Sequence, residues 1–247
     1  MGGFHAIITR TYIRIFGYRE FVIEMRTLWE SDGNTTSFIL ADVEPEYEAT
    51  VRHLYYQPVE RGFAKSYPAD KPHLDRVFTN FERYAPQMVL QAAERKPIPW
   101  EQALEALIQV IADEPIDWWI IGSSALAVRG IDIEPHDIDL VTDEDGAERL
   151  YALLENYVVE PLQSGWIWRA FGRAFLHSRV EWIGSVSDNV DDSGPTEFGT
   201  TARNRLEVVH WCGTEIRVPP LDIQLAICEQ RKLTERSKKI RRFMAAS

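Results

Sequence analysis

Residues 116–142 read Ile-Asp-Trp-Trp-Ile-Ile-Gly-Ser-Ser-Ala-Leu-Ala-Val-Arg-Gly-Ile-Asp-Ile-Glu-Pro-His-Asp-Ile-Asp-Leu-Val-Thr. An apolar run typical of a buried strand ends at Gly122, a short helical pattern extends to Gly130, and a second apolar segment carries Asp137 and Asp139. Because side chains alternate along a strand, both carboxylates are expected to project from the same face. Two adjacent negative charges need a cation, and we predict Mg²⁺, which prefers oxygen ligands.

This segment resembles the signature of the nucleotidyltransferase superfamily, whose members have a DNA polymerase β-like fold. Gly122-Ser123 is followed by thirteen residues and then by Asp137-Ile-Asp139-Leu. The resemblance covers residues 116 to about 185, continues more weakly through residues 218–229, and is absent from residues 1–95. It implies an α+β fold with a mixed sheet flanked by helices, and transfer of a nucleoside monophosphate from a nucleoside triphosphate.

Members of this superfamily complete their metal site with a third carboxylate on a later strand. The best match is Glu181, in an alternating segment that places Arg179, Glu181 and Ile183 on one face. Glutamate stands where the superfamily more often has aspartate, so Glu181 is either a metal ligand or the general base that takes the acceptor proton. The plain alternative is an exposed carboxylate paired with Arg169, Arg173 or Arg179.

The small residues after the first strand predict a binding site for phosphate. Gly122, Ser123 and Ser124 let a polyanion approach the backbone, and the N–H groups at a helix N-terminus favour negative charge. We therefore predict that these residues hold the triphosphate, although the same residues would also serve as an ordinary helix cap. Arg129 is predicted either to contact a phosphate or to pair with Asp132 or Glu134.

The resemblance implies two Mg²⁺ ions held by Asp137, Asp139 and Glu181. One ion would activate an acceptor hydroxyl, and the other would hold the triphosphate and stabilise departing pyrophosphate. Taken alone, Asp-Ile-Asp is also compatible with a solvated strand face or with the metal-binding Asp-x-Asp of sugar-nucleotide transferases. The combination with the Gly-Ser turn at this spacing favours the nucleotidyltransferase.

Composition and charge narrow the choice of partners. The chain has 247 residues, 45% of them apolar, and a formal charge of −11. No apolar run is long enough to cross a membrane and no secretion signal is apparent, so the cytoplasm is the expected location and no membrane partner is expected. Proteins that bind nucleic acid usually present a basic face, so the acidic balance favours neutral or cationic acceptors such as aminoglycosides.

Two charged segments leave the identity of the acceptor substrate undecided. The acidic stretch 187–197 could attract a polycation, but it is also typical of an ordinary solvated loop. Residues 231–243 contain seven basic residues and one acidic residue, with Leu233, Ile240 and Phe243 as a thin apolar stripe. We predict a helix packed on the body with its basic face outward, a face that RNA or the nucleotide's phosphates could contact.

The remaining pattern predicts a small α+β domain over residues 1–95 and the nucleotidyltransferase-like domain with C-terminal helices over residues 96–247. In the first we expect strands over residues 21–29 and 36–43 joined by the turn Ser31-Asp-Gly-Asn34, a helix over 44–55, a strand over 62–67 and a helix over 72–93. In the second we expect a helix over 100–111, hairpins over 166–185 and 206–218, and helices from Leu221 onward.

The sequence thus predicts a Mg²⁺-dependent enzyme that transfers a nucleoside monophosphate to a hydroxyl group of a small molecule, for example an antibiotic. Two alternatives stay open. One is a nucleotidyltransferase toxin that acts on tRNA or protein, for which the basic tail and the unassigned first domain leave room. The other is a nucleotide-binding module of the same fold without catalysis.

Overall fold

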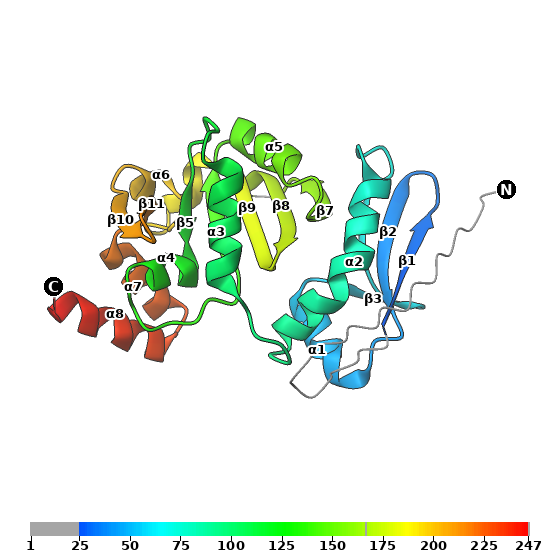
Figure 1. Ribbon diagram of the computed structural model, residues 1–247, viewed down its shortest axis with the longest axis horizontal. Coiled ribbons are helices and arrows are strands. Elements are labelled where there is room, and N and C mark those ends of the chain that lie inside the picture. The colour runs from blue at the N-terminus through cyan, green and yellow to red at the C-terminus, as the bar shows by residue number, and fades with distance from the viewer. Residues whose placement is uncertain (1–24, 166, 247) are drawn as a thin grey trace. The chain divides into compact units, whose positions relative to one another are not determined.

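The computed structural model describes residues 25–165 and 167–246 (Figure 1). The chain divides into two compact units. The first extends to Pro97 and also takes in Glu155–Pro161, and the second consists of Ile98–Leu154 and the chain from Leu162 onward. The expected boundary was at residue 95. The return of residues 155–161 to the first unit was not foreseen, because that segment is separated from it in sequence.

In the part of the first unit that the structure describes, a four-stranded antiparallel sheet is accompanied by two helices. Its sheet has the order β1-β2-β4-β3. The elements are β1 (Arg26–Ser31), β2 (Thr35–Ala41), α1 (Pro45–His53), β3 (Gln57–Val59), β4 (Gly62–Pro68) and α2 (Leu74–Ala92). The predicted hairpin is present, with Ser31 opposite Thr36, although residues 21–24 of its first predicted strand lie outside the described residues.

The core of the first unit is aromatic. Helix α2 carries apolar residues at spacings of three and four, and this face is buried against the sheet. The ring centroid of Phe38 lies 5.1 Å from that of Phe78 and 5.4 Å from that of Phe81. Beside this core, Lys65 pairs with the buried carboxylate of Glu160 at 2.6 Å, so the charge of Glu160 is neutralised.

A five-stranded mixed sheet has the order β5-β6-β9-β8-β7; four of these strands lie wholly in the second unit, whereas β7 begins within residues 155–161, which belong to the first. Strands β6 and β9 are parallel, whereas β5–β6 and β8–β9 are antiparallel. The elements are α3 (Trp100–Ile111), β5 (Trp119–Ile121), α4 (Gly122–Val128), β6 (Ile138–Thr142), α5 (Glu144–Leu153), β7 (Val158–Gln163), β8 (Trp168–Leu176), β9 (Ser178–Val186), the 3₁₀ helix η1 (Asp188–Asp191), α6 (Thr200–Arg203), β10 (Glu207–Trp211), β11 (Thr214–Val218), α7 (Leu221–Gln230) and α8 (Thr234–Ala246). The predicted strand, turn, helix and strand of residues 116–142 are present as β5, α4 and β6.

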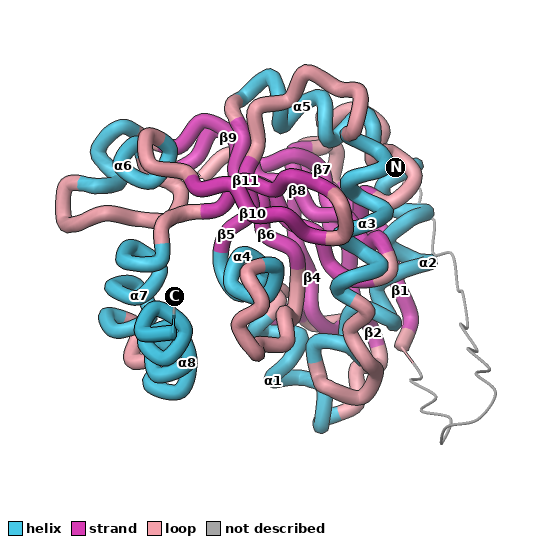
Figure 2. Tube along the Cα trace, turned by 60° about the vertical axis from the view of Figure 1, so that its left-hand side comes forward, coloured by secondary structure: helices cyan, strands magenta, loops and turns pink. Residues whose placement is uncertain are grey.

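Helices α3 and α5 cover one face of this sheet (Figure 2). The Trp182 indole donates a hydrogen bond to the carbonyl of Ala147 in α5 at 3.2 Å, and a Cβ at Gly184 would lie 2.6 Å from that of Ala147. Since side chains alternate along β9, Glu181 and Ile183 point to the opposite face. That face therefore carries the predicted site and is free of α3 and α5.

The C-terminal helices pack beside α4, as Figure 1 shows. Cys228 and Ile240 are buried against Leu126 and Ile131, with Leu233 and Phe243 partly buried at the edge. The predicted apolar stripe is thus confirmed. Three basic residues of α8 form ion pairs: Lys238 with Glu235, Lys239 with Asp132 and Arg241 with Glu229.

Candidate active site

Three carboxylates converge at one end of the mixed sheet. Asp137 immediately precedes β6, Asp139 lies on β6, and Glu181 lies directly opposite Asp139 on the parallel strand β9. One oxygen from each of the three lies within 4.8 Å of the others, and all three side chains are partly buried. The parallel register of β6 and β9 brings together residues that are 42 positions apart in the chain.

The turn after β5 brings backbone close to these carboxylates. Gly122 has a φ of 66°, a conformation that favours glycine, and a Cβ at this position would lie 3.2 Å from Oδ2 of Asp139. Ser123 and Ser124 follow in the first turn of α4, and both are buried. The Ser124 hydroxyl donates to the carbonyl of Ile121 at 2.9 Å, so this side chain stabilises the turn itself.

Glu197 is a residue of the site that the sequence did not reveal. Its Oε1 accepts hydrogen bonds from the Gly122 amide at 3.0 Å and from Gln224 Nε2 at 2.7 Å. Its carbonyl accepts from the Trp119 indole at 3.0 Å. Glu197 therefore fixes the turn at Gly122, and the first amide of α4 is already engaged.

The prediction that residues 187–197 form a solvated loop is wrong for Glu197, because this residue is only 9% exposed. Burial raises the pKa of the Glu197 carboxyl group, and hydrogen bonds from Gln224 and from the Gly122 amide oppose that rise. Within a stretch rich in Asp, Ser and Gly, nothing in the sequence distinguishes this carboxylate from its solvated neighbours. Its partners come from α4 and α7, which are far away in the sequence.

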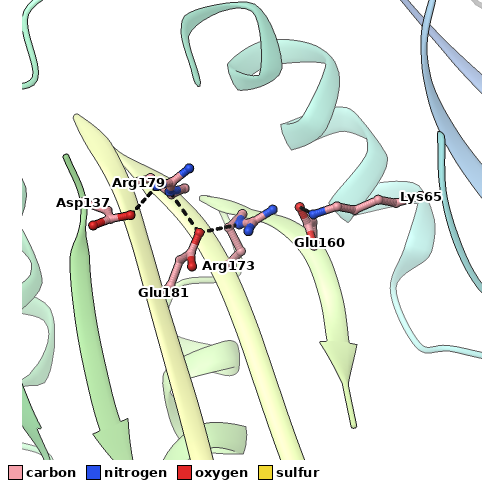
Figure 3. A network of polar contacts seen from close by, with 6 residues as sticks. All are labelled: Lys65, Asp137, Glu160, Arg173, Arg179 and Glu181. Atoms are coloured by element: carbon pink, nitrogen blue, oxygen red, sulfur yellow. Dashed lines mark hydrogen bonds and ion pairs between the residues drawn. The ribbon is translucent and has the colours of Figure 1, made fainter. Parts of the chain in front are cut away.

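Two arginines contact the carboxylates (Figure 3). Arg179, on β9, donates from Nη2 to Oδ2 of Asp137, and its Nε lies 2.9 Å from Oε1 of Glu181 in an ion pair without a hydrogen bond. Arg173, on β8, donates from Nε to the same oxygen of Glu181 at 2.8 Å. The pairing predicted for Glu181 thus occurs with Arg173 and Arg179, whereas Arg169 pairs with Glu144. Glu181 is therefore both a member of the acidic cluster and an ion-pair partner.

The electrostatics of the cluster call for a further cation. Burial raises the pKa of Asp139 well above its ordinary value, and the nearby charges of Asp137 and Glu181 raise it further. Burial lowers the pKa of the Arg179 guanidinium, but Glu181 and Asp137 outweigh this effect and raise it overall. Among the described residues, Asp139 makes no hydrogen bond or ion pair. A donor set of carboxylate oxygens suits Mg²⁺.

Arg129 pairs with residues other than those predicted for it. Its Nη2 donates to the carbonyl of Pro219 at 2.7 Å and lies 2.6 Å from Oε2 of Glu207. Its side chain is 8% exposed. The predicted pairing with Asp132 or Glu134 is wrong, because α4 packs against β10 and presents Arg129 to that strand instead. Contact of Arg129 with phosphate stays a prediction.

A pocket of about 570 Å³ lies farther along the same strands. Val141, two residues after Asp139, lines it, and two residues along a strand span about 7 Å. Its charged residues balance: Asp143 and Asp188 against Arg169 and Arg203. Its aromatic residues are Trp119, Trp168 and Phe198. Of the carboxylates in residues 187–197, Asp188 lines this pocket and Asp192 is exposed outside it, whereas Asp191 and Glu197 accept hydrogen bonds within the protein.

Comparison with known proteins agrees with the motif. The family model for aminoglycoside-2″-adenylyltransferase matches residues 103–170, which contain the Gly122 turn and both aspartates. The predicted resemblance to nucleotidyltransferases is confirmed. No curated protein matches the chain. None of the helices within the described residues is long and apolar enough to cross a membrane.

Several solved structures resemble part of the chain. A candidate nucleotidyltransferase from Thermotoga maritima is 22% identical over 60% of this chain and 93% of its own, with a TM-score of 0.45. The lincosamide antibiotic adenylyltransferase LnuA, solved with lincomycin, is 15% identical over 57% of this chain and 96% of its own, with a TM-score of 0.42. ANT(2″)-Ia, solved with adenylyl-2″-tobramycin, is 11% identical over 58% of this chain and 88% of its own, with a TM-score of 0.41.

Proposed function

We propose that this chain is a metal-dependent nucleotidyltransferase that transfers AMP from ATP to a hydroxyl group of a small molecule, in the first instance an aminoglycoside. The observation that carries the proposal is the convergence of Asp137, Asp139 and Glu181 beside the glycine turn that opens α4. The match of residues 103–170 to an aminoglycoside adenylyltransferase model supports the choice of ATP and of the acceptor class.

Each residue has a role that follows from its position. Asp137 and Asp139 would hold Mg²⁺, and Glu181 would supply the third carboxylate. When bound, the metal would neutralise charge on the triphosphate and lower the pKa of the attacking hydroxyl. The backbone at Ser123 and Ser124 would hold the phosphates at the start of α4. Glu197 and Gln224 would keep the Gly122 turn in place while the phosphates bind.

The pocket beyond Val141 supports a small acceptor rather than a macromolecule. Val141, which lines it, follows Asp139 by two residues on β6, a rise of about 7 Å along the strand, and the pocket offers aromatic walls with balanced charge. An RNA substrate was the alternative suggested by the seven basic residues within residues 231–243. Three of these seven residues form ion pairs within the protein, which reduces the free positive charge available for a phosphate backbone.

The test is a transfer assay with ATP labelled at the α-phosphate, Mg²⁺ and a panel of aminoglycosides and lincosamides. We expect a labelled acceptor together with one pyrophosphate per transfer. Asp139→Asn should lower kcat/KM by about a thousandfold, because charge neutralisation dominates this chemistry. Asp192→Asn is the matched control, since Asp192 is an exposed carboxylate of the same unit.

Two outcomes would contradict the proposal. Equal transfer by wild type and Asp139→Asn would exclude Asp139 from the reaction. Binding of Mg²⁺ and ATP without pyrophosphate release, with every acceptor of the panel and with tRNA, would favour the non-catalytic module.

A further inference from the structure

The guanidinium group of Arg179 lies between two of the carboxylates assigned to metal binding (Figure 3). Its Nη2 contacts Asp137 and its Nε lies 2.9 Å from Glu181. The three side chains are only 15% to 17% exposed, so water screens these contacts weakly. In the metal-free protein, Arg179 therefore supplies positive charge at the place where a divalent ion would supply it.

The metal and this guanidinium compete for the same ligands. Mg²⁺ binds oxygen at about 2.0–2.1 Å and needs near-octahedral geometry, which leaves no room for a cation between the ion and its ligands. One carboxylate oxygen from each of the three residues already lies within 4.8 Å of the others. Arg179 contacts Oδ2 of Asp137 and Oε1 of Glu181, so coordination of an ion through Oδ2 of Asp137 requires the guanidinium to give up that contact.

Glu181 does not depend on Arg179 for its position. Arg173 donates to Glu181 Oε1 at 2.8 Å, and its side chain is almost completely buried at 2% exposure. It pairs with Glu181 across the β8–β9 ladder, in register with Asp139 on the other side of β9. When Arg179 leaves, Glu181 stays aligned with Asp139, while Asp137 becomes available.

We propose that Arg179 is a built-in counter-cation that holds the acidic cluster together without metal and is displaced when metal and nucleotide bind. The inference rests on the proposed function. The displaced guanidinium needs a new anionic partner in a partly buried site, and a phosphate group of the donor nucleotide is the anion that arrives there. Metal alone should consequently bind weakly, and metal and nucleotide should strengthen each other's binding.

The first test measures the affinity of the full chain for Mn²⁺ alone by calorimetry and by the electron paramagnetic resonance signal of free Mn²⁺. Arg179→Gln removes the competing charge, and we expect it to bind Mn²⁺ about tenfold more tightly than wild type. Arg179→Lys keeps the charge but cannot span both carboxylates, and it should fall between the two. The control is Arg149→Gln, because Arg149 is 50% exposed and pairs with Glu114 outside the cluster.

The second test repeats the Mn²⁺ titration with α,β-methylene ATP, which cannot release pyrophosphate. The analogue should raise the Mn²⁺ affinity of wild type by a larger factor than that of Arg179→Gln, because only wild type gains a partner for the displaced guanidinium. Coupling of this kind is reciprocal, so Mn²⁺ should tighten analogue binding by the same factor.

The outcomes separate the two claims. Equal or weaker Mn²⁺ binding by Arg179→Gln, with the variant folded by circular dichroism, would overturn the role of Arg179 and leave the proposed function intact. Equal coupling in both proteins would do the same. Failure of wild type and all variants to bind Mn²⁺, with or without the analogue, would overturn the proposed metal-dependent function itself.

Discussion

Gly122 shows how a single residue serves both the fold and the site. Its φ of 66° starts α4 directly from β5, and its missing Cβ leaves room for Oδ2 of Asp139. Gly130 also has a positive φ, 85°, but a Cβ there would meet nothing within 4 Å. Alanine at Gly130 therefore tests backbone strain alone, whereas alanine at Gly122 tests strain together with crowding of the Asp139 carboxylate.

We expect Gly122→Ala and Gly130→Ala each to lower the free energy of unfolding by about 1 kcal/mol, because alanine disfavours a positive φ. Gly122→Ala alone should also weaken Mn²⁺ binding, since its new methyl group displaces Asp139. Urea unfolding and Mn²⁺ titration measure the two effects. Unchanged Mn²⁺ affinity in Gly122→Ala would show that the turn does not shape the metal site.

The buried carboxyl group of Glu197 should make the free energy of unfolding depend on pH. Burial raises its pKa, so folding favours the protonated carboxyl group, and wild type loses stability as the pH rises from the ordinary value of 4.5 through the raised value. Glu197→Gln has no such proton to lose. The stability of the variant relative to wild type should therefore increase from pH 4 to pH 8, as measured by urea unfolding at both values. A difference that is independent of pH would contradict the buried position of this carboxylate.

At the scale of elements, the connection between β9 and α6 depends on one side chain. Asp191 accepts hydrogen bonds from the backbone and hydroxyl of Thr196 and from the amide of Thr201, each at 2.9 Å. These bonds close the loop over residues 191–201 and so place Glu197 under the Gly122 turn. Burial raises the pKa of Asp191, but the hydrogen bonds from Thr201 and Thr196 outweigh it and lower the pKa overall.

Asp191→Asn should cost about 1–2 kcal/mol of unfolding free energy at pH 7, because an amide cannot accept all of these bonds. The lowered pKa means that wild type has this stability above the ordinary value of 3.8 and loses it as the pH falls through the folded-state value. The gap between wild type and variant should therefore shrink below pH 4. Asp192→Asn, an exposed neighbour, should change stability little, and an equal loss in both variants would contradict the capping role of Asp191.

Elements with a strong local pattern were predictable, and elements built from distant contacts were not. The β5–α4–β6 segment, helices α2 and α3 and the hairpin β8–β9 follow from periodicity and turn residues, and they agree with the sequence. Strands β3 and β7 were missed. Each contains a proline, Pro58 or Pro161, and β7 also contains the charged Glu160. Such residues argue against a strand unless tertiary contacts compensate for them.

The same distinction applies to the site. Asp137, Asp139 and Glu181 are brought together as the alternating pattern and the resemblance predicted. Glu197 and the partner of Arg129 depend on how α7, β10 and the loop before α6 pack against α4, which no local pattern encodes. Sequence reasoning therefore found the carboxylates and missed the residues that hold the turn beside them.

At the scale of the whole molecule, the charge of −11 makes an unaided approach of a triphosphate unfavourable. Binding of the nucleotide should therefore depend on the metal, and the metal site should depend on the two aspartates. This dependence distinguishes a nucleotidyltransferase, which requires it, from a protein with an incidental acidic cluster, which does not.

The most direct test is calorimetric titration of ATP, GTP, CTP and UTP into the full chain with and without Mg²⁺, for wild type and for the double variant Asp137→Ala, Asp139→Ala. We predict that wild type binds ATP most tightly, that chelation of Mg²⁺ abolishes the binding, and that the double variant does not bind. Nucleotide binding of equal strength in both proteins, or binding unaffected by removal of Mg²⁺, would contradict this prediction.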